Sequence, residues 1–183
     1  IYHGNYGSSI LERGAEFVAP MKEISPFDDY AAKDMDKWTT YLGPTRGYGE
    51  QVYCCVPYAN SVGKSLVMLH NKAATEGVAI SFDTKTLPFF TLWKNTDTLK
   101  DGYVTGLEPG TGYPYNRAIE RHYKRVPKIG PGAKVTFRSS YTILNSPEDV
   151  SKVKAAIAAI QDGRPTKKNA APTTDKSVIE TDK

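Results

Sequence analysis

The stretch that decides the fold spans residues 50–71 and reads EQVYCCVPYANSVGKSLVMLHN. It contains two runs rich in β-branched, aromatic and other apolar residues, at 50–58 and 64–71, and these predict two strands. The segment between them, residues 59–63, contains Asn, Ser and Gly, which are typical turn residues. We therefore expect a pair of strands joined by a hairpin loop.

Short runs of the same kind recur along the chain. Residues 1–19 read as a strand, a turn and a second short strand, and further strands are predicted at 77–83, 87–94, 102–108 and 133–144. Residues 20–49 read as a polar connection with one or two helical turns near 30–38. This connection is longer than structureless loops usually are, so we expect it to be functional or packed down by its own aromatic residues. Several short strands separated by turn signals predict an all-β sandwich or barrel.

One helix is predicted near the C-terminus. Ser146 is a good N-cap and Pro147 suits the first helical position. Apolar residues then recur at helical spacing at Val150, Val153, Ile157 and Ile160, and Gly163 provides a stop. We expect this helix on the outside of the sheet. Residues 164–183 have almost no hydrophobic content, so they are predicted to be a disordered tail behind a domain at 1–163.

Composition and charge exclude several classes of partner. No run of about 20 apolar residues exists, so no membrane partner is expected. The formal net charge is +4, half of it from residues 164–183, and no basic stripe or nucleic-acid-binding motif appears. Cys54 and Cys55 are neighbours that point to opposite faces of a strand, so a disulfide framework is excluded and a cytoplasmic location is favoured. Because the opening residues read as the middle of a folded structure, we expect an N-terminal part of the same domain to be missing.

The sharpest candidate for chemistry lies in the sequence GYVTGLEPGT at residues 102–111. Strand alternation puts Val104, Gly106 and Glu108 on one face, and Pro109 keeps Glu108 extended, so the strand is predicted to end at the carboxylate. Gly106 removes side-chain bulk where a ligand could approach. A general base is one interpretation of Glu108, and an ion pair with a Lys or Arg at the sheet edge is the other.

A second candidate group lies at the start of the chain, where His3 and Asn5 share a strand face. Histidine exchanges a proton near neutral pH, although a surface or structural role is equally compatible with the pattern. The remaining candidates could contact a ligand or serve packing and solvation: Gln51, Trp93, Lys94 and Arg117. No metal-ligand cluster, phosphate-binding loop or nucleophile elbow appears in the sequence, and no cofactor is expected.

Five motifs in order resemble the galactose mutarotase superfamily, and more closely its uncharacterised aldose 1-epimerase-like branch. They are YHGNYG at 2–7, EQVY at 50–53, LPFFTLWK at 87–94, GYVTGLEPGT at 102–111 and IGPGA at 129–133. The resemblance implies a large antiparallel β-supersandwich, incomplete at its N-terminus here and carrying one C-terminal helix. It also implies that Glu108 takes the proton of an anomeric hydroxyl and that His3 protonates the ring oxygen, although the usual continuation after the histidine is replaced by Asn5-Tyr6-Gly7.

The implied activity is cofactor-free interconversion of sugar anomers, with a small-molecule carbohydrate as the partner. Such chemistry needs one base and one acid, which we expect on opposite sides of the sugar, separated by the width of its ring. The alternatives are a non-catalytic sugar-binding module, in which Glu108 alone would reach the cavity, and a purely structural β-domain without a polar cavity. A further expectation is that this chain alone is inactive, because missing strands would remove substrate contacts.

Overall fold

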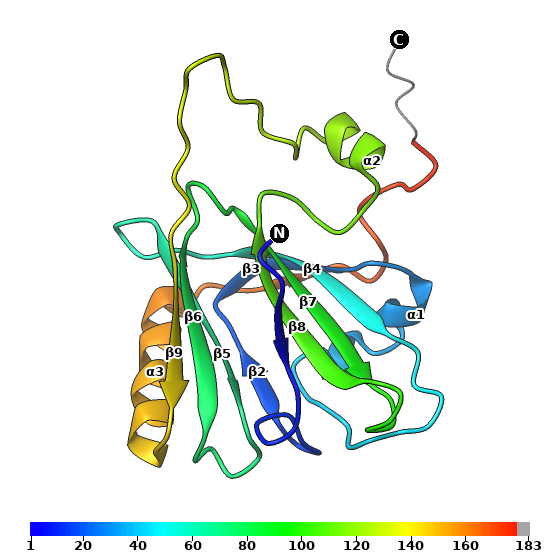
Figure 1. Ribbon diagram of the computed structural model, residues 1–183, viewed down its shortest axis with the longest axis vertical. Coiled ribbons are helices and arrows are strands. Elements are labelled where there is room, and N and C mark those ends of the chain that lie inside the picture. The colour runs from blue at the N-terminus through cyan, green and yellow to red at the C-terminus, as the bar shows by residue number, and fades with distance from the viewer. Residues whose placement is uncertain (179–183) are drawn as a thin grey trace.

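Two β-sheets packed face to face form the body of the structure. The computed structural model describes residues 1–178 (Figure 1). The six-stranded sheet has the order β1 (Gly4–Tyr6), β8 (Tyr103–Gly110), β7 (Phe89–Thr96), β4 (Gln51–Pro57), β3 (Met21–Pro26) and β10 (Lys167–Lys168). The four-stranded sheet has the order β2 (Glu16–Val18), β5 (Lys64–His70), β6 (Gly77–Asp83) and β9 (Ser139–Leu144). The pairs are antiparallel except β10 with β3, so the prediction of an all-β sandwich is confirmed.

The helical elements are few and short apart from one. They are α1 (Asp29–Ala32), the 3₁₀ helix η1 (Met35–Lys37), α2 (Arg117–His122) and α3 (Pro147–Gln161). The first two fall within the predicted helical turns at 30–38. None of the helices within residues 1–178 has the length and apolar character needed to cross a membrane.

Aromatic side chains join the two sheets. The ring of Phe90 on β7 stacks on Phe17 of β2 at 5.5 Å and on Phe82 of β6 at 5.8 Å between centroids. All three are buried, and Tyr53 and Leu107 from the six-stranded sheet belong to the same core. The inward faces of the two sheets therefore pack against each other, and a binding site can lie only on an outward face.

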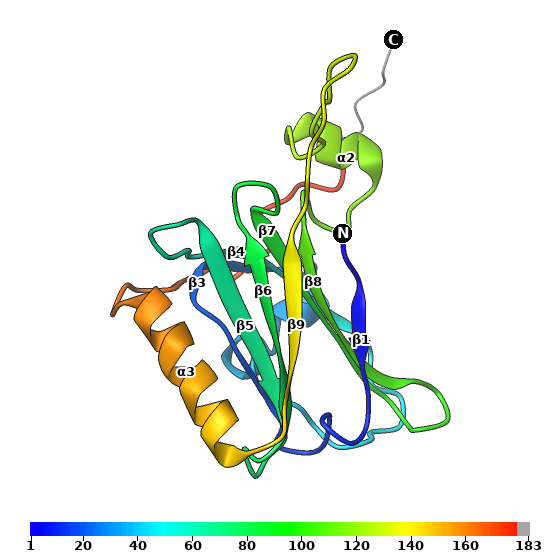
Figure 2. The same cartoon turned by 60° about the vertical axis from the view of Figure 1, so that its left-hand side comes forward.

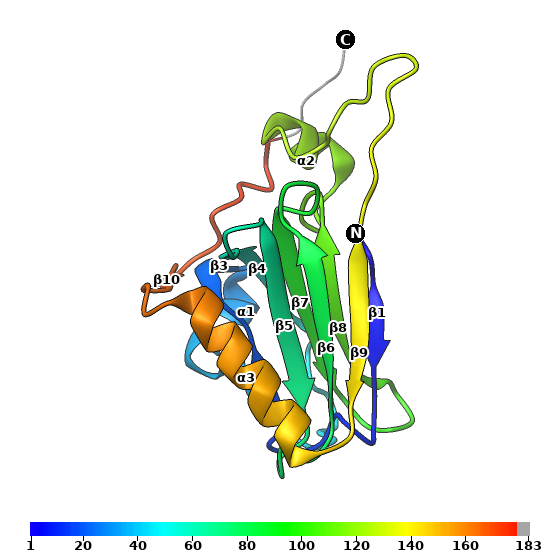
Figure 3. The same ribbon diagram turned by 90° about the vertical axis from the view of Figure 1, so that its left-hand side faces the viewer.

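The predicted C-terminal helix is confirmed, with the expected cap. The hydroxyl oxygen of Ser146 accepts a hydrogen bond from the backbone N–H of Asp149 at 3.1 Å. Buried Val150 and Ile157 pack against Met68, Ala79 and other side chains on the outer face of the four-stranded sheet. Figures 2 and 3 show α3 lying along that face, so the molecule has three layers: helix, four-stranded sheet and six-stranded sheet.

Strand β3 corrects the interpretation of residues 20–49 as a polar connection. Met21 and Ile24 of this strand are fully buried in the core, and its register with β4 shifts between Met21 and Glu23. The interrupted pattern hides the strand, because the bulge and the terminal Pro26 break the alternation that identifies strands. The predicted hairpin at 59–63 is also wrong, because β4 and β5 belong to different sheets and this turn carries the chain between them.

Several strand boundaries differ from the prediction, and β7, expected at 87–94, runs from Phe89 to Thr96. Strand β8 continues two residues past Glu108, with Pro109 opposite Phe90 and its carbonyl accepting a hydrogen bond from the backbone N–H of Tyr2 at 2.9 Å. A proline is tolerated there because β1 is short and β8 needs no further donor at that position. Strand β9 begins at Ser139, so the first half of the predicted strand at 133–144 is irregular.

β1 and β9 are edge strands of the two different sheets, and Figures 2 and 3 show them on the same side of the sandwich. Ile143 of β9 lies opposite Val78, a core residue, and so faces the space between the sheets. Its exposed fraction is nevertheless 73%, and Tyr141 on the same face is 49% exposed. The described residues therefore do not close the core along this side.

The prediction of a disordered tail is wrong for residues 164–178, and residues 179–183 lie outside the described residues. Strand β10 pairs in parallel with β3, and the hydroxyl of Thr166 donates to the carbonyl of Met21 at 2.7 Å. Thr174 is buried, with its hydroxyl oxygen accepting a hydrogen bond from Arg125. The segment is polar because it makes hydrogen bonds to a sheet edge and buries little apolar surface.

Asn169 holds this segment in place, which gives a first prediction. Its side-chain amide donates to Glu23 Oε1 at 2.7 Å and to Ser25 Oγ at 2.9 Å. Each such bond is worth about 1 kcal/mol, so Asn169→Ala should raise cleavage of residues 165–178 by proteinase K about 5- to 30-fold. Lys168→Ala, at an exposed neighbour, is the control and should leave the rate unchanged. Equal rates for both variants would show that Asn169 does not hold the segment.

Candidate active site on the outer face of the six-stranded sheet

The side chains of Glu108 and His3 lie next to each other on two adjacent segments of the chain. Glu108 lies on β8, and the β1–β8 pairing of Gly4 with Leu107 places His3 beside it. The predicted alternation holds, because Leu107 points into the core whereas Gly106 and Glu108 share the outer face. A Cβ atom added at Gly106 would clash with the Glu108 carboxylate and lie 3.1 Å from the His3 ring. A glycine at 106 is therefore required for the two side chains to meet.

The acid–base pair is in direct contact. His3 Nε2 lies 2.9 Å from Glu108 Oε1, with the carboxylate buried (3% exposed) and the imidazole half exposed. The two atoms are close enough for an ion pair, but they are not aligned as a hydrogen bond requires. The buried Oε1 therefore has no hydrogen-bond donor among the described residues. Burial raises the pKa of Glu108 from 4.5 to about 7, opposed by the α-amino group of Ile1. The expected gap of a sugar ring's width between His3 and Glu108 is absent, because adjacent strands hold them side by side.

A cavity of about 430 Å³ opens over this pair. Trp93 lies at its side, with its ring edge-on to His3 at 5.7 Å between centroids. The indole N–H of Trp93 donates to Glu50 Oε2 at 2.9 Å. The remaining lining residues are apolar apart from one hydroxyl: Ile1, Phe27, Val52, Thr91 and Pro114. A mostly apolar hollow with a few convergent polar groups is the usual form of a small-molecule site.

Thr91 is a site residue that sequence reasoning missed. It lies opposite Glu108 on β7, on the face that also carries Trp93, and it is almost fully buried. Its hydroxyl has no hydrogen-bond partner among the described residues. The signal was present in the alternation of residues 87–94, where Thr91 and Trp93 share a face, but a threonine in a strand usually indicates only β-propensity.

Gln51 and Lys94 lie outside this cavity and border a separate hollow of about 120 Å³. The two residues are partners across β4 and β7. Gln51 precedes Val52 and Lys94 follows Trp93. Because Val52 and Trp93 face the cavity, their neighbours in sequence must face inward. Gln51 donates to Asp34 Oδ2 at 2.7 Å and accepts from the hydroxyl of Tyr48 at 2.7 Å.

The ammonium group of Lys94 satisfies backbone carbonyls in the interior. It donates to the carbonyl oxygens of Lys37 at 3.0 Å and Thr40 at 2.7 Å. Burial lowers its pKa to about 8, with Asp34 opposing the shift. Lys94 therefore supports the loop at 37–40, on the opposite side of the sheet from Glu108.

Asn5 and Arg117 are also not among the residues that line the cavity. Asn5 is exposed and lies opposite Gly106 on the same sheet face, two residues after His3. Arg117 begins α2 and borders a separate hollow of about 290 Å³ together with Glu120 and Arg125. Of the predicted residues, the structure thus brings together His3, Trp93 and Glu108.

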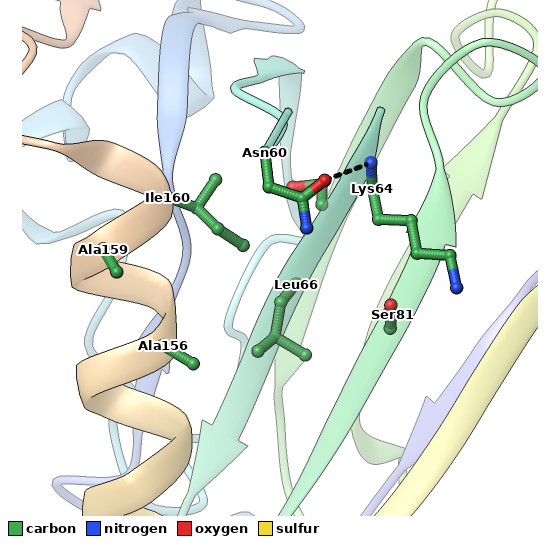
Figure 4. A pocket seen from close by; sticks show the side chains of 8 residues that line it. Asn60, Lys64, Leu66, Ser81, Ala156, Ala159 and Ile160 are labelled. Carbon is green, nitrogen blue, oxygen red and sulfur yellow. Dashed lines mark hydrogen bonds between the residues drawn. The ribbon is translucent and has the colours of Figure 1, made fainter. Parts of the chain in front are cut away.

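A further hollow lies on the other side of the molecule (Figure 4). It measures about 370 Å³ and is enclosed by α3 and by strands β5 and β6. Ala156 and Ile160 from the helix face Leu66 on β5, and Asn60 Oδ1 accepts a hydrogen bond from the backbone N–H of Lys64 at 2.9 Å. Its lining contains one titratable group, Lys64, so it offers no acid–base pair and the cavity at Glu108 remains the candidate site.

The unpartnered hydroxyl of Thr91 gives a prediction about stability. Thr91→Val removes a desolvated group that forms no hydrogen bond, so the free energy of unfolding should rise by about 1 kcal/mol or stay unchanged. Thr105→Val is the matched control, because that hydroxyl donates to the carbonyl of Trp93 at 2.6 Å and contacts the hydroxyl of Tyr41 at 2.8 Å. We expect the control to lose about 1–2 kcal/mol in urea unfolding. A larger loss for Thr91→Val than for Thr105→Val would contradict the assignment.

The raised pKa of Glu108 predicts how stability changes with pH. A carboxyl whose pKa is higher in the folded state favours folding when it is protonated. This contribution is fully present below about pH 4.5 and is lost as the pH rises to about 7. Glu108→Gln should abolish this loss, which we expect to be on the order of 1–3 kcal/mol. Urea unfolding of both proteins across this range tests it, and parallel pH profiles would contradict a buried Glu108.

Comparison with known proteins places this chain in a family. The family described as a domain of unknown function (DUF4432) matches residues 1–143. The crystal structure of a "putative aldose 1-epimerase" from Klebsiella pneumoniae subsp. pneumoniae MGH 78578 has a TM-score of 0.94 and 46% sequence identity, covering 95% of this chain and 45% of that chain. A search of curated proteins gives no match. The chain belongs to the DUF4432 family, and its fold is that of the aldose 1-epimerase-like β-sandwiches.

Proposed function

We propose that this protein binds a sugar at the cavity over Glu108 and interconverts its anomers. One observation carries the proposal: the carboxylate of Glu108 is buried, has no hydrogen bond to Oε1 and faces a 430 Å³ cavity beside His3. A buried polar atom without a partner is costly, so a ligand that supplies a hydroxyl group would relieve the cost. The likeness to a solved protein described as an aldose 1-epimerase supports the same class of ligand.

The walls of the cavity suit a pyranose ring. Trp93 presents an aromatic surface, and Phe27, Val52 and Pro114 add apolar contacts. Sugars have apolar C–H faces and polar edges, and they are bound by aromatic rings below and hydrogen-bonding groups at the side. Glu108 and Thr91 lie at the closed end, where they can meet hydroxyl groups of the ring edge.

The chemistry needs two proton transfers, and two side chains of this site suffice for them. Ionised Glu108 accepts the proton of the hydroxyl on C1, while protonated His3 gives its proton to the ring oxygen O5 as the C1–O5 bond breaks. The product is the open-chain aldehyde, whose C1 carbonyl rotates. O5 then attacks the other face of C1, returning its proton to His3 while the carbonyl oxygen recovers a proton from Glu108. Both side chains end as they began.

The contact between His3 and Glu108 sets the approach of the sugar. Because O1 and O5 are attached to the same carbon, an acid and a base that lie side by side can serve both oxygens from one edge of the ring. The sugar would therefore enter with C1 toward the pair, and its ring would extend past Trp93. This replaces the arrangement with acid and base on opposite sides of the ring.

The second candidate is a sugar-binding module without catalysis. Two observations favour it: the ion-pair contact occupies both catalytic groups with each other, and this chain spans less than half of the Klebsiella protein it resembles. The activity of the longer protein is therefore a proposal for this chain. Catalysis and binding are separable, since only catalysis requires that Glu108 is ionised and His3 is protonated.

Polarimetry of freshly dissolved α-glucose or α-galactose, together with titration calorimetry, tests the two candidates. Glu108→Gln and His3→Gln should each lower the catalysed mutarotation rate by about 10²–10⁴-fold while retaining sugar binding. In the unmodified protein the rate should rise with pH until about 7, where Glu108 becomes ionised. Glu76→Gln, on the turn before β6, is the control and should have no effect. Binding without catalysis in the unmodified chain would establish the binding module, and absence of sugar binding would refute both candidates.

A further inference from the structure

The lining of the cavity over Glu108 contains two carboxylates and, among the described residues, no Lys or Arg side chain. Among its lining residues, all within the described chain, Glu50 and Glu108 are carboxylates and His3 is the one side chain that can carry a positive charge. Nearby cations serve other partners: Lys176 lies over the ring of Phe27 at 3.9 Å, and Arg125 is paired with Glu120 at 2.6 Å. The positive groups of the lining, His3 and the α-amino group of Ile1, lie at the Glu108 end of the cavity. A phosphate or carboxylate group on the part of a ligand near Glu50 would thus meet a like charge.

Glu50 is held at the rim of the cavity without a cationic partner. The indole N–H of Trp93 donates to its Oε2 at 2.9 Å, which fixes the carboxylate next to the aromatic ring. In the part of the chain that the structure describes, Glu50 takes part in no ion pair. A carboxylate beside an aromatic ring attracts a cation through its charge and through the ring face.

Independent evidence for a ligand comes from the closed end of the same cavity. Glu108 Oε1 and Thr91 Oγ1 are both buried, lie on cross-strand neighbours and have no hydrogen bond among the described residues. Such atoms are normally satisfied by a partner in the working state of a protein. The end of the cavity at Glu108 and Thr91 can therefore bind hydroxyl groups, and the carboxylate of Glu50 at the rim can bind a cation.

We propose that this cavity selects sugars by charge, taking an amino sugar in its protonated form in preference to a neutral hexose, and a neutral hexose in preference to a sugar phosphate. This rests on the proposed function, because it assumes that a sugar occupies the site. Glucosamine carries its ammonium group on C2, the carbon next to C1. With C1 at Glu108 and C2 turned toward Trp93, this group would form an ion pair with the Glu50 carboxylate, which Trp93 holds beside its ring. Because Glu50 is exposed, we expect this ion pair to raise the affinity only by the small factor that is typical of surface ion pairs.

Titration calorimetry of the whole chain at low ionic strength and about pH 6 tests the order. The probes are glucose, glucosamine, N-acetylglucosamine and glucose 6-phosphate. We expect glucosamine to bind about two- to fivefold more tightly than glucose, the acetylated sugar to lose this advantage because it is uncharged, and the phosphate to bind more weakly than glucose. Raising the salt to about 0.5 M should shrink both differences.

Glu50→Gln is the decisive variant, because glutamine can still accept the hydrogen bond of Trp93 while it lacks the charge. It should abolish the preference for glucosamine and leave the affinity for glucose within about twofold. Glu76→Gln makes the same change of net charge at an exposed position on the turn before β6 and should leave the preference intact. If glucose binds but glucosamine gains nothing, or if the preference survives in Glu50→Gln, charge selection is refuted and the proposed function stands. If no sugar binds, both fail.

Discussion

The burial of the Glu108 carboxylate is the constraint on which the outer face of the six-stranded sheet depends. The side chain is 3% exposed and one of its oxygens has no hydrogen bond, so its burial lowers the stability of the fold. The same burial raises the pKa of Glu108 to about 7. The neighbouring positions accommodate it: Gly106 leaves room beside it, and His3, just before β1, offers a proton. Local instability of this kind is typical of sites that act on ligands, since a bound group supplies the missing interaction.

Strand alternation explains why one sheet can hold both the core and the site. Phe90, Leu92 and Leu107 point between the sheets, and Thr91, Trp93 and Glu108 point outward from the same strands. A shift of one residue in register would exchange the two sets, so the aromatic packing of Phe90 also fixes which side chains enter the cavity. For the same reason Gln51 and Lys94, though next to cavity residues in sequence, lie in the interior.

Much of this arrangement could be predicted from local pattern, and the failures have identifiable physical causes. Eight of the strands, the capped helix α3 and the shared face of Gly106 and Glu108 follow from alternation and capping residues. Strand β3 was missed because a bulge interrupts its pattern, and the segment at 164–178 because its hydrogen bonds to β3 leave no trace in hydrophobicity. Thr91 and the contact of His3 with Glu108 depend on which strands pair, and β1 and β8 are about a hundred residues apart.

The ionisation of Glu108 tests this account most directly. Carbon-13 NMR of the side-chain carboxyl of Glu108, identified by its loss in Glu108→Gln, can follow its titration with and without a bound hexose. The account predicts a midpoint near pH 7 in the free protein and a shift of the signal when the sugar binds. A midpoint near 4.5 that no sugar disturbs would mean that the carboxylate is solvated and lies outside any binding site.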